Sequence, residues 1–201
     1  MTISHSITAK VGRPRNTEMH TATCQAVLKM IGDGETLTSL SLVAIAHETG
    51  ISRNALYRRW NSKGELYSDV LSSMRRPLVD LTEQSARENL IEIVTSWRNS
   101  GGDSRERGMK RAIVAEAQNF PDLYQQYLTE IVTPVWSIVK LAIRRGKETG
   151  EIRNDVDEEL LCGVAVSSAC SGSSLDVEGL SDFASASQRV IDLVFDGVAP
   201  K

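Results

Sequence analysis

Residues 40–66, LSLVAIAHETGISRNALYRRWNSKGEL, constrain the fold of this chain more than any other stretch. Apolar residues recur at three- and four-residue spacing on both sides of Gly50, and a glycine there suits the left-handed conformation that ends a helix before a sharp turn. Ser41 and Ser52 stand at expected helix N-caps, where a serine hydroxyl accepts a hydrogen bond from the first turn. The stretch predicts two short helices joined by a tight turn, with a further helix after residue 61.

The polar face of these helices has the chemistry of a DNA-binding surface. Its members are Arg53, Asn54, Tyr57, Arg58, Arg59 and Lys63. A helix that begins at Ser52 in a helix-turn-helix points its first turns into the major groove of DNA. There Arg53 and Arg58 can each donate two hydrogen bonds to guanine, and Asn54 can pair with adenine. Ala55 is small enough to allow a close approach and to touch a thymine methyl group.

The rest of the chain continues the helical pattern, so we expect an all-α protein with about nine helices. The expected helices cover about residues 17–31, 41–49, 52–60, 62–74, 78–97, 107–118, 122–145, 157–171 and 181–195. Pro134 lies inside the seventh of them, which predicts a kink or a break there. The expected organisation is a flexible basic arm (1–15), a helix-turn-helix domain (16–74, with the motif at about 39–60) and a larger C-terminal regulatory and dimerisation domain (75–201).

The formal charge of −3 is unevenly distributed along the chain. Residues 1–76 hold ten Lys and Arg against six Asp and Glu, whereas residues 77–201 hold thirteen against twenty. The positive excess accompanies the helix-turn-helix, as phosphate binding requires. No signal peptide or membrane-spanning run is apparent, so a cytoplasmic protein is expected. In that compartment Cys24, Cys162 and Cys170 are expected to be buried free thiols, with a redox sensor as the alternative.

Residues 42–66 resemble the DNA-binding domain of the tetracycline-repressor (TetR) family. The matching residues are Ile45-Ala46, Gly50-Ile51-Ser52, Leu56-Tyr57-Arg58, Trp60, Ser62-Lys63 and Leu66. The run Gly12-Arg13-Pro14-Arg15 is similar to the basic arm of the family, and residues 145–157 resemble one subgroup of its C-terminal domains. Two departures are small. Trp60 stands where Phe is more usual, and Gly64 weakens the first turn of its helix by roughly 1 kcal/mol relative to Ala.

The resemblance implies further contacts with the DNA backbone. Tyr57 and Lys63 are expected to bind phosphates, and Ser41 at the N-terminus of the second helix is expected to do the same. Arg13 and Arg15 of the arm are candidates for the adjacent minor groove, where narrow A·T tracts attract arginine. The alternative for each of these side chains is a solvated surface position.

One such domain covers a short half-site, so specific binding predicts a homodimer on a palindromic operator. The resemblance places the dimer contact on the last two helices, which pack with their copies into a four-helix bundle. The candidate interface residues are Ala165, Ser168, Ala169, Gly172, Phe183, Val190 and Val194. The alternative for the serine-rich part of this set is a frayed helix end followed by a loop.

The resemblance also implies a small-molecule cavity among the middle helices, whose filling changes the spacing of the two DNA-binding domains. The aromatic residues of that region are Trp97, Phe120, Tyr124, Tyr127 and Trp136. Ordinary core packing is the alternative for each of them.

The favoured function is a homodimeric, sequence-specific transcriptional regulator, a repressor that leaves its operator on binding a small molecule. The alternative is a DNA-binding architectural protein without a ligand switch, which would bind with little sequence preference. An enzyme is disfavoured, because His5, His20 and His47 lie apart from one another and from the cysteines, without metal-ligand spacing. No phosphate-binding loop or nucleophile motif occurs either, and no cofactor is expected.

Overall fold

Ten α-helices and one π-helical segment make up the described part of the chain, residues 15–82, 84–99, 103–174 and 183–198 of this computed structural model. They are α1 (Arg15–Gly32), α2 (Leu42–Thr49), α3 (Arg53–Arg59), α4 (Lys63–Ser73), α5 (Ala86–Asn99), α6 (Ser104–Ala115), α7 (Pro121–Tyr127), η1 (Leu128–Val132), α8 (Thr133–Glu148), α9 (Glu158–Ser174) and α10 (Phe183–Val198). Because α7, η1 and α8 follow one another without interruption, nine continuous helical segments result, and the all-α prediction is confirmed. None of these helices is long and apolar enough to cross a bilayer.

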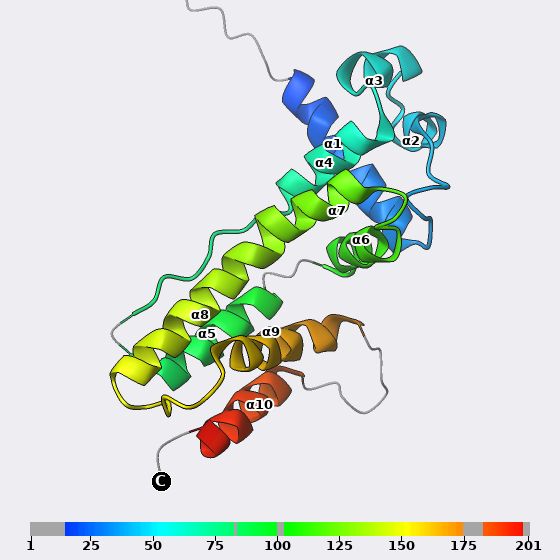
Figure 1. Ribbon diagram of the computed structural model, residues 1–201. Helices are drawn as coiled ribbons and strands as arrows, with labels where there is room; N and C mark the ends of the chain where they lie inside the picture. The colour runs from blue at the N-terminus through cyan, green and yellow to red at the C-terminus, as the bar shows by residue number, and fades with distance from the viewer. Residues whose placement is uncertain (1–14, 83, 100–102, 175–182, 199–201) are drawn as a thin grey trace, which may run out of the picture.

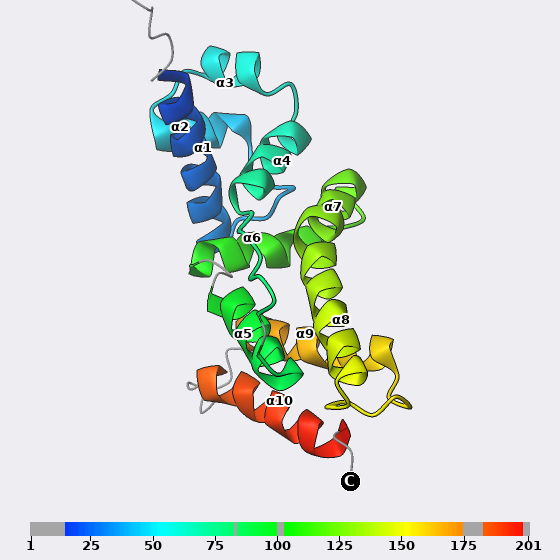
Figure 2. The same cartoon turned by 90° about the vertical axis from the view of Figure 1, so that its left-hand side faces the viewer.

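The N-terminal helices share an apolar core with two helices from the middle of the chain. In Figures 1 and 2, α1–α4 gather at one end of the molecule, with α6 and α7 packed next to them. Leu56, Trp60 and Tyr67 are buried in this first core together with Met109 of α6 and Leu123 of α7. The helix-turn-helix is therefore packed directly on the middle of the chain.

Local capping defines the two helices of the motif as the sequence predicts. The Ser41 hydroxyl accepts from the Ala44 N–H at 3.1 Å, and the Ser52 hydroxyl accepts from the Ala55 N–H at 3.3 Å. Gly50 between the helices has a φ of 68°, the left-handed conformation that favours glycine. These three predictions are confirmed, and together they set the angle between α2 and α3.

A second apolar core lies at the opposite end of the molecule, between α5, α8, α9 and α10 (Figure 1). Val139 of α8 and Cys162 of α9 are fully buried in it, and Phe195 covers it from α10. An ion pair between Arg87 of α5 and Asp192 of α10 lies at the surface of this core. Exposed pairs of this kind contribute at most about 1 kcal/mol, so apolar burial holds these four helices together.

The expected helix over 78–97 begins only at Ala86, which corrects the prediction. Ser85 and Glu88 form a capping box just before it: the Glu88 N–H donates to the Ser85 hydroxyl at 3.2 Å, and the Glu88 carboxylate accepts from the Ser85 N–H at 3.0 Å. The described residues between Pro77 and this cap are not helical and form a connection from α4 to α5. Leu78 in this connection is exposed, whereas Val79 and Leu81 are half-buried. The apolar spacing that predicted the helix, at residues 90, 91, 94 and 97, lies entirely within α5.

The next helix also begins earlier than the predicted range of 107–118. Its N-cap is Asp103, whose carboxylate accepts from the N–H groups of Arg105 and Glu106 at 2.9 and 3.1 Å. An aspartate is a strong N-cap, so this start follows from local chemistry that apolar spacing alone did not reveal.

Pro134 does not break its helix, because α7, η1 and α8 form one rod (Figure 1). The turn before the proline is π-helical, and there the Thr133 N–H donates to the carbonyl of Leu128, five residues back. Proline has no N–H to donate to the preceding turn. A single widened turn shifts the hydrogen-bond ladder at that point, as π-bulges do, and the helix continues.

Candidate nucleic-acid interface and effector cavity

Helix α3 lies at the end of the molecule farthest from α10 (Figures 1 and 2). Leu56 is completely buried on its inner face. Arg53, Asn54 and Arg58 are exposed on its outer face, and Tyr57 is 52% exposed. A short helix with one face anchored in a core and a cationic, amide-bearing face in solvent has the form of a recognition helix.

Asp69 of α4 fixes the C-terminal end of α3. Its Oδ2 accepts from the indole Nε1 of Trp60 at 2.8 Å and from the guanidinium of Arg59 at 3.2 Å, and it lies 3.3 Å from Nε2 of His20 on α1. The Arg59 guanidinium also lies 5.5 Å from the centre of the Trp60 ring, a cation–π contact. Arg59 is thus engaged within the protein, and α3 is tied to both α4 and α1.

The remaining predicted DNA-contact residues have different environments. Ser41 and Ser52 are exposed but their hydroxyls cap helices, and Ala55 is half-buried. Arg13 lies outside the described residues. Arg15 is the first residue of α1, and its side chain is also outside the described part. The structure therefore leaves the minor-groove prediction for the arm untested.

Lys63, which is predicted to bind phosphate, is bound to the protein backbone in the structure. Its ammonium donates to the backbone carbonyls of Leu37, Thr38 and Leu40 at 3.1, 2.7 and 3.0 Å. An ammonium has three N–H donors, and all three are accounted for by these carbonyls. Lys63 therefore holds the segment that precedes α2, which we call the 36–40 segment. A contact between residues so far apart along the chain cannot be predicted from local sequence patterns.

Two further side chains hold the 36–40 segment, from α4 and from the C-terminal end of α6. The buried Tyr67 hydroxyl donates to the carbonyl of Leu37 at 2.8 Å. The Glu116 carboxylate accepts from the N–H groups of Leu37 and Thr38 at 2.6 and 3.0 Å. Although burial alone would raise the pKa of Glu116, hydrogen bonds from the Thr38 hydroxyl and these two amides hold that pKa below its usual value. Glu116 thus links α6 to the residues that set the position of α2.

Glu116→Gln should flatten the acid side of the stability profile. A depressed pKa in the folded state contributes stability that is present above the unfolded pKa, about 4.5, and is lost as the pH falls through the folded pKa. The variant should be less stable at pH 7 and should lose less on further acidification, as measured by urea unfolding from pH 7 to pH 3.5. Glu92→Gln, at an exposed position of α5, is the control. An unaltered pH profile in Glu116→Gln would contradict the role of this carboxylate.

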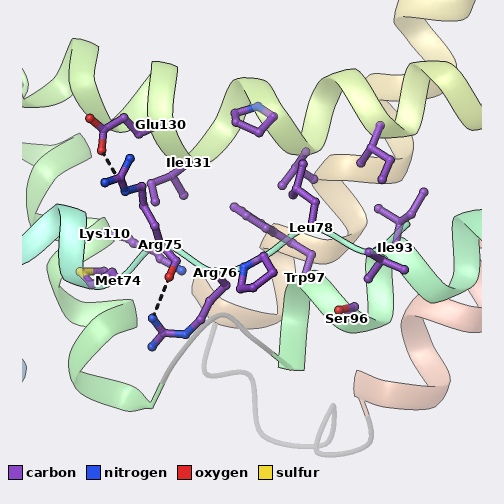
Figure 3. Close-up of a pocket in the computed structure, with 15 residues that line it drawn as sticks. Met74, Arg75, Arg76, Leu78, Ile93, Ser96, Trp97, Lys110, Glu130 and Ile131 are labelled. Carbon is purple, nitrogen blue, oxygen red and sulfur yellow. Dashed lines mark hydrogen bonds and ion pairs between the residues drawn. The ribbon is translucent and has the colours of Figure 1, made fainter. Parts of the chain in front are cut away.

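A cavity of about 170 Å³ lies between the α4–α5 connection, α5, α6, η1 and α8 (Figure 3). Its lining consists of Met74, Arg75, Arg76, Pro77, Leu78, Val79, Ile93, Ser96, Trp97, Lys110, Glu130, Ile131, Pro134, Val135 and Ile138. Figure 3 shows that the charged groups of Arg75 and Glu130 lie toward one end, whereas Leu78 and Ile93 lie toward the other. The cavity therefore has one charged end, next to the end of α4, and one apolar end.

Of the five aromatic residues predicted to line a ligand cavity, Trp97 alone lines this one. Phe120 packs edge-on against Tyr67, with ring centres 5.6 Å apart, and belongs to the first core. Tyr124 and Tyr127 are half-buried against that same core, and Trp136 packs on the second core. For these four the alternative of core packing holds. Most of the residues that line the cavity are apolar. Nothing in the sequence distinguishes them from residues of an ordinary core.

The decisive comparison concerns the C-terminal half of the chain. Residues 82–170 match the family model described as "Tetracyclin repressor-like, C-terminal domain". Together with the N-terminal helix-turn-helix, this match identifies the family of the protein. The chain belongs to the TetR family.

Known transcriptional regulators are similar to this chain in sequence or in fold, at low sequence identity. The uncharacterized HTH-type transcriptional regulator YdeS of Bacillus subtilis is 23% identical over 154 residues, which are 76% of each chain. A TetR transcriptional regulator from Agrobacterium tumefaciens has a TM-score of 0.69 at 14% identity, with 92% of this chain and 96% of that chain covered. FadR of Bacillus subtilis in complex with stearoyl-CoA has a TM-score of 0.60 at 15% identity, with 89% and 99% covered. The fold of this TetR-family protein is therefore shared along nearly its whole length.

The residues predicted to form the dimer surface of this TetR-family protein have different environments in the structure. Ala165 is 1% exposed and faces the second core, so it is not free to meet a partner, whereas Val194 is half-buried against the same core. The side chains of Ser168, Ala169, Gly172, Phe183 and Val190 lie outside the described part. Among the described side chains of α9 and α10, the large apolar ones that are exposed are Leu160, Val164 and Leu193, at 69%, 37% and 74%. Leu160 and Val164 are four residues apart and so lie on one face of α9, a spacing that the sequence prediction did not use.

The cysteines of this TetR-family protein behave as the favoured prediction expects. Cys24 and Cys162 are buried free thiols, and burial raises the pKa of each to about 11. A thiol so far from ionisation at neutral pH is a poor nucleophile, which argues against the redox-sensor alternative for these two. The side chain of Cys170 lies outside the described residues.

Proposed function

We propose that this TetR-family regulator is a repressor that binds a palindromic operator as a homodimer and leaves it when a small molecule enters the cavity beside α4. The observation that carries the proposal is the anchored helix α3. Its inner face is buried, Asp69 fixes its C-terminal end, and Arg53, Asn54, Tyr57 and Arg58 extend into solvent. Such a rigid helix can present the same donors at every binding event, as sequence recognition requires.

In this proposal Arg53, Asn54 and Arg58 contact base edges, and Ala55 lies against the floor of the groove. Tyr57 and the N-termini of α2 and α3, with Ser41 and Ser52, contact phosphates. Arg13 and Arg15 contact the minor groove beside the half-site. Lys63 is left out of the DNA contacts because of its three carbonyl partners.

The homodimer is proposed to form through α9 and α10. Leu160 and Val164 lie one helical turn apart on α9, and Leu193 is an exposed leucine of α10. Large apolar side chains on adjacent helices support a self-complementary contact around a twofold axis, since their burial between two copies is favourable. Leu193→Glu is the direct test, because it should shift the protein toward monomer in sedimentation and weaken operator binding.

Arg58→Ala should cost about 1–3 kcal/mol on the matching operator and relax the base preference at one position of each half-site. Selection of bound DNA from a random pool measures both the parent consensus and the change. Arg153→Ala is the matched control, since Arg153 pairs with Asp155 on the α8–α9 connection, far from α3. An equal loss of affinity on all sequences would argue that Arg58 contacts phosphate and no base.

The alternative function, an architectural DNA-binding protein, is separated by the same selection. It predicts no palindromic consensus and a small ratio of specific to non-specific affinity at fixed salt. The family model and the relatives support regulation over enzymatic activity. Release by a small molecule is supported by the cavity, and FadR provides a precedent in the fold, having been crystallised with stearoyl-CoA.

A further inference from the structure

We propose that the effector of this regulator is a small, largely apolar molecule that carries a hydroxyl group, and that the hydroxyl binds between Arg75 and Glu130. The inference rests on the proposed function, because it takes the cavity beside α4 as the effector site. It goes further in naming the chemical class and the two side chains that recognise it.

Glu130 has one satisfied and one unsatisfied oxygen at the charged end of the cavity. Its Oε1 accepts from the side-chain amide of Gln126 at 3.1 Å. Its Oε2 is shielded from solvent and has no hydrogen-bond partner. The nearest cation is Arg75, whose Nε lies 3.6 Å away (Figure 3). That distance gives an ion pair but is too long for a hydrogen bond, so a buried acceptor faces the cavity with no donor.

A hydroxyl suits this arrangement better than a charged group does. It can donate to Glu130 Oε2 and at the same time accept from the Arg75 guanidinium, so both protein groups gain a hydrogen bond. A carboxylate would be attracted by Arg75 and by Lys110 but repelled by Glu130, and with no proton to donate it would leave Glu130 Oε2 without a donor. An ammonium would meet Glu130 but would be repelled by Arg75 and by Lys110, which also lines the cavity.

The size and lining of the cavity limit the rest of the molecule. About 170 Å³ is slightly more than the roughly 150 Å³ of a cavity that holds benzene, so a single ring or a short branched chain fits. Leu78, Ile93 and Ile131 provide apolar contact, and Trp97 adds an aromatic wall. A phenol or an alcohol of similar size therefore matches both ends of the cavity.

The bound hydroxyl would also touch the DNA-binding half of the protein. Arg75 lies two residues beyond the end of α4. Gln126, which donates to Glu130, also accepts from the Ser68 hydroxyl on α4. A group that draws Arg75 and Glu130 into new hydrogen bonds therefore acts on the helix that supports α3 through Asp69.

The test uses phenol, toluene, benzoate and benzylamine as probes, with binding to the full-length protein measured by calorimetry. Phenol should bind at least about ten-fold more tightly than the other three, since a hydrogen bond to a buried charge discriminates by roughly that factor. Tighter binding of benzoate or benzylamine, or failure of all four to bind, would overturn the proposal.

A pair of conservative variants separates the hydroxyl contact from a general effect of charge removal. Glu130→Gln should weaken phenol about ten-fold and leave toluene unchanged. Glu106→Gln is the matched control, because Glu106 also has a buried oxygen without a hydrogen-bond partner but does not line the cavity. Equal phenol affinity in both variants would overturn the proposal. Selection of a palindromic DNA consensus with the same preparation tests the proposed function separately, so a protein that binds its operator but not phenol refutes this inference alone.

Discussion

Lys63→Met is expected to lower the free energy of unfolding by about 2 kcal/mol and to weaken DNA binding on every sequence, without changing the salt dependence. The side chain supplies charge-assisted hydrogen bonds to three carbonyls of the 36–40 segment, and each such bond to a charged group contributes in the range of about 1.5–3 kcal/mol when fully buried. Lys63 is only half-buried, so we expect the three bonds together to contribute about 2 kcal/mol, near the lower end of the range for a single buried bond. Methionine keeps most of the aliphatic stem and removes the donors.

The salt dependence separates this role from a phosphate contact. Each phosphate contact contributes about 0.9 to the slope of log K against log salt, so loss of a phosphate-binding lysine would reduce the slope by that amount. Lys147→Met is the control for stability, because Lys147 donates to the backbone carbonyls of Asn154 and Val156 on the α8–α9 connection. Lys147→Met should also destabilise the protein. DNA binding, measured at a temperature at which both variants are folded, should not be weakened by it. A reduced slope in Lys63→Met would show instead that Lys63 contacts a DNA phosphate.

Gly146→Ala is expected to destabilise the protein by about 1–3 kcal/mol even though alanine favours helices. Gly146 lies buried in α8, where an added Cβ would come within 2.6 Å of the Ala86 Cβ and 2.7 Å of the Ile152 Cδ1. The first of these atoms is a methyl group attached directly to the backbone of α5. The two helices must therefore move apart, and the second core would lose contact along their whole crossing.

Gly64→Ala is the matched control for Gly146→Ala. Gly64 is also helical, in the first turn of α4, but an added Cβ there would meet nothing closer than the Ser62 hydroxyl at 3.6 Å. Urea unfolding should show a gain of up to about 1 kcal/mol, from helix propensity alone. Shifts of the same sign in the two variants would show that helix propensity, and not the close approach of α5 to α8, dominates at Gly146.

Most of the helix-turn-helix was predictable because its causes are local. The caps at Ser41 and Ser52 and the left-handed Gly50 involve residues within a few positions of one another, and each was predicted correctly. The family was identifiable from the same segment, since its motif is defined by spacing along one short stretch. The helix starts at Ala86 and Ser104 were missed, although their capping residues were equally local, because apolar spacing was followed past them.

The sequence by itself determined which helices form around the motif, which of their faces is buried, and which side chains of α3 are exposed, because a helix and its caps are decided by neighbours along the chain. Only the tertiary structure decided what distant residues do to one another. Glu116 meets Leu37 across 79 positions, and Lys63 meets three carbonyls more than twenty residues away. The cavity likewise draws its charged groups from the α4–α5 connection, α6 and η1. The packing of the helices brings these groups within hydrogen-bond distance, and no local pattern encodes that packing.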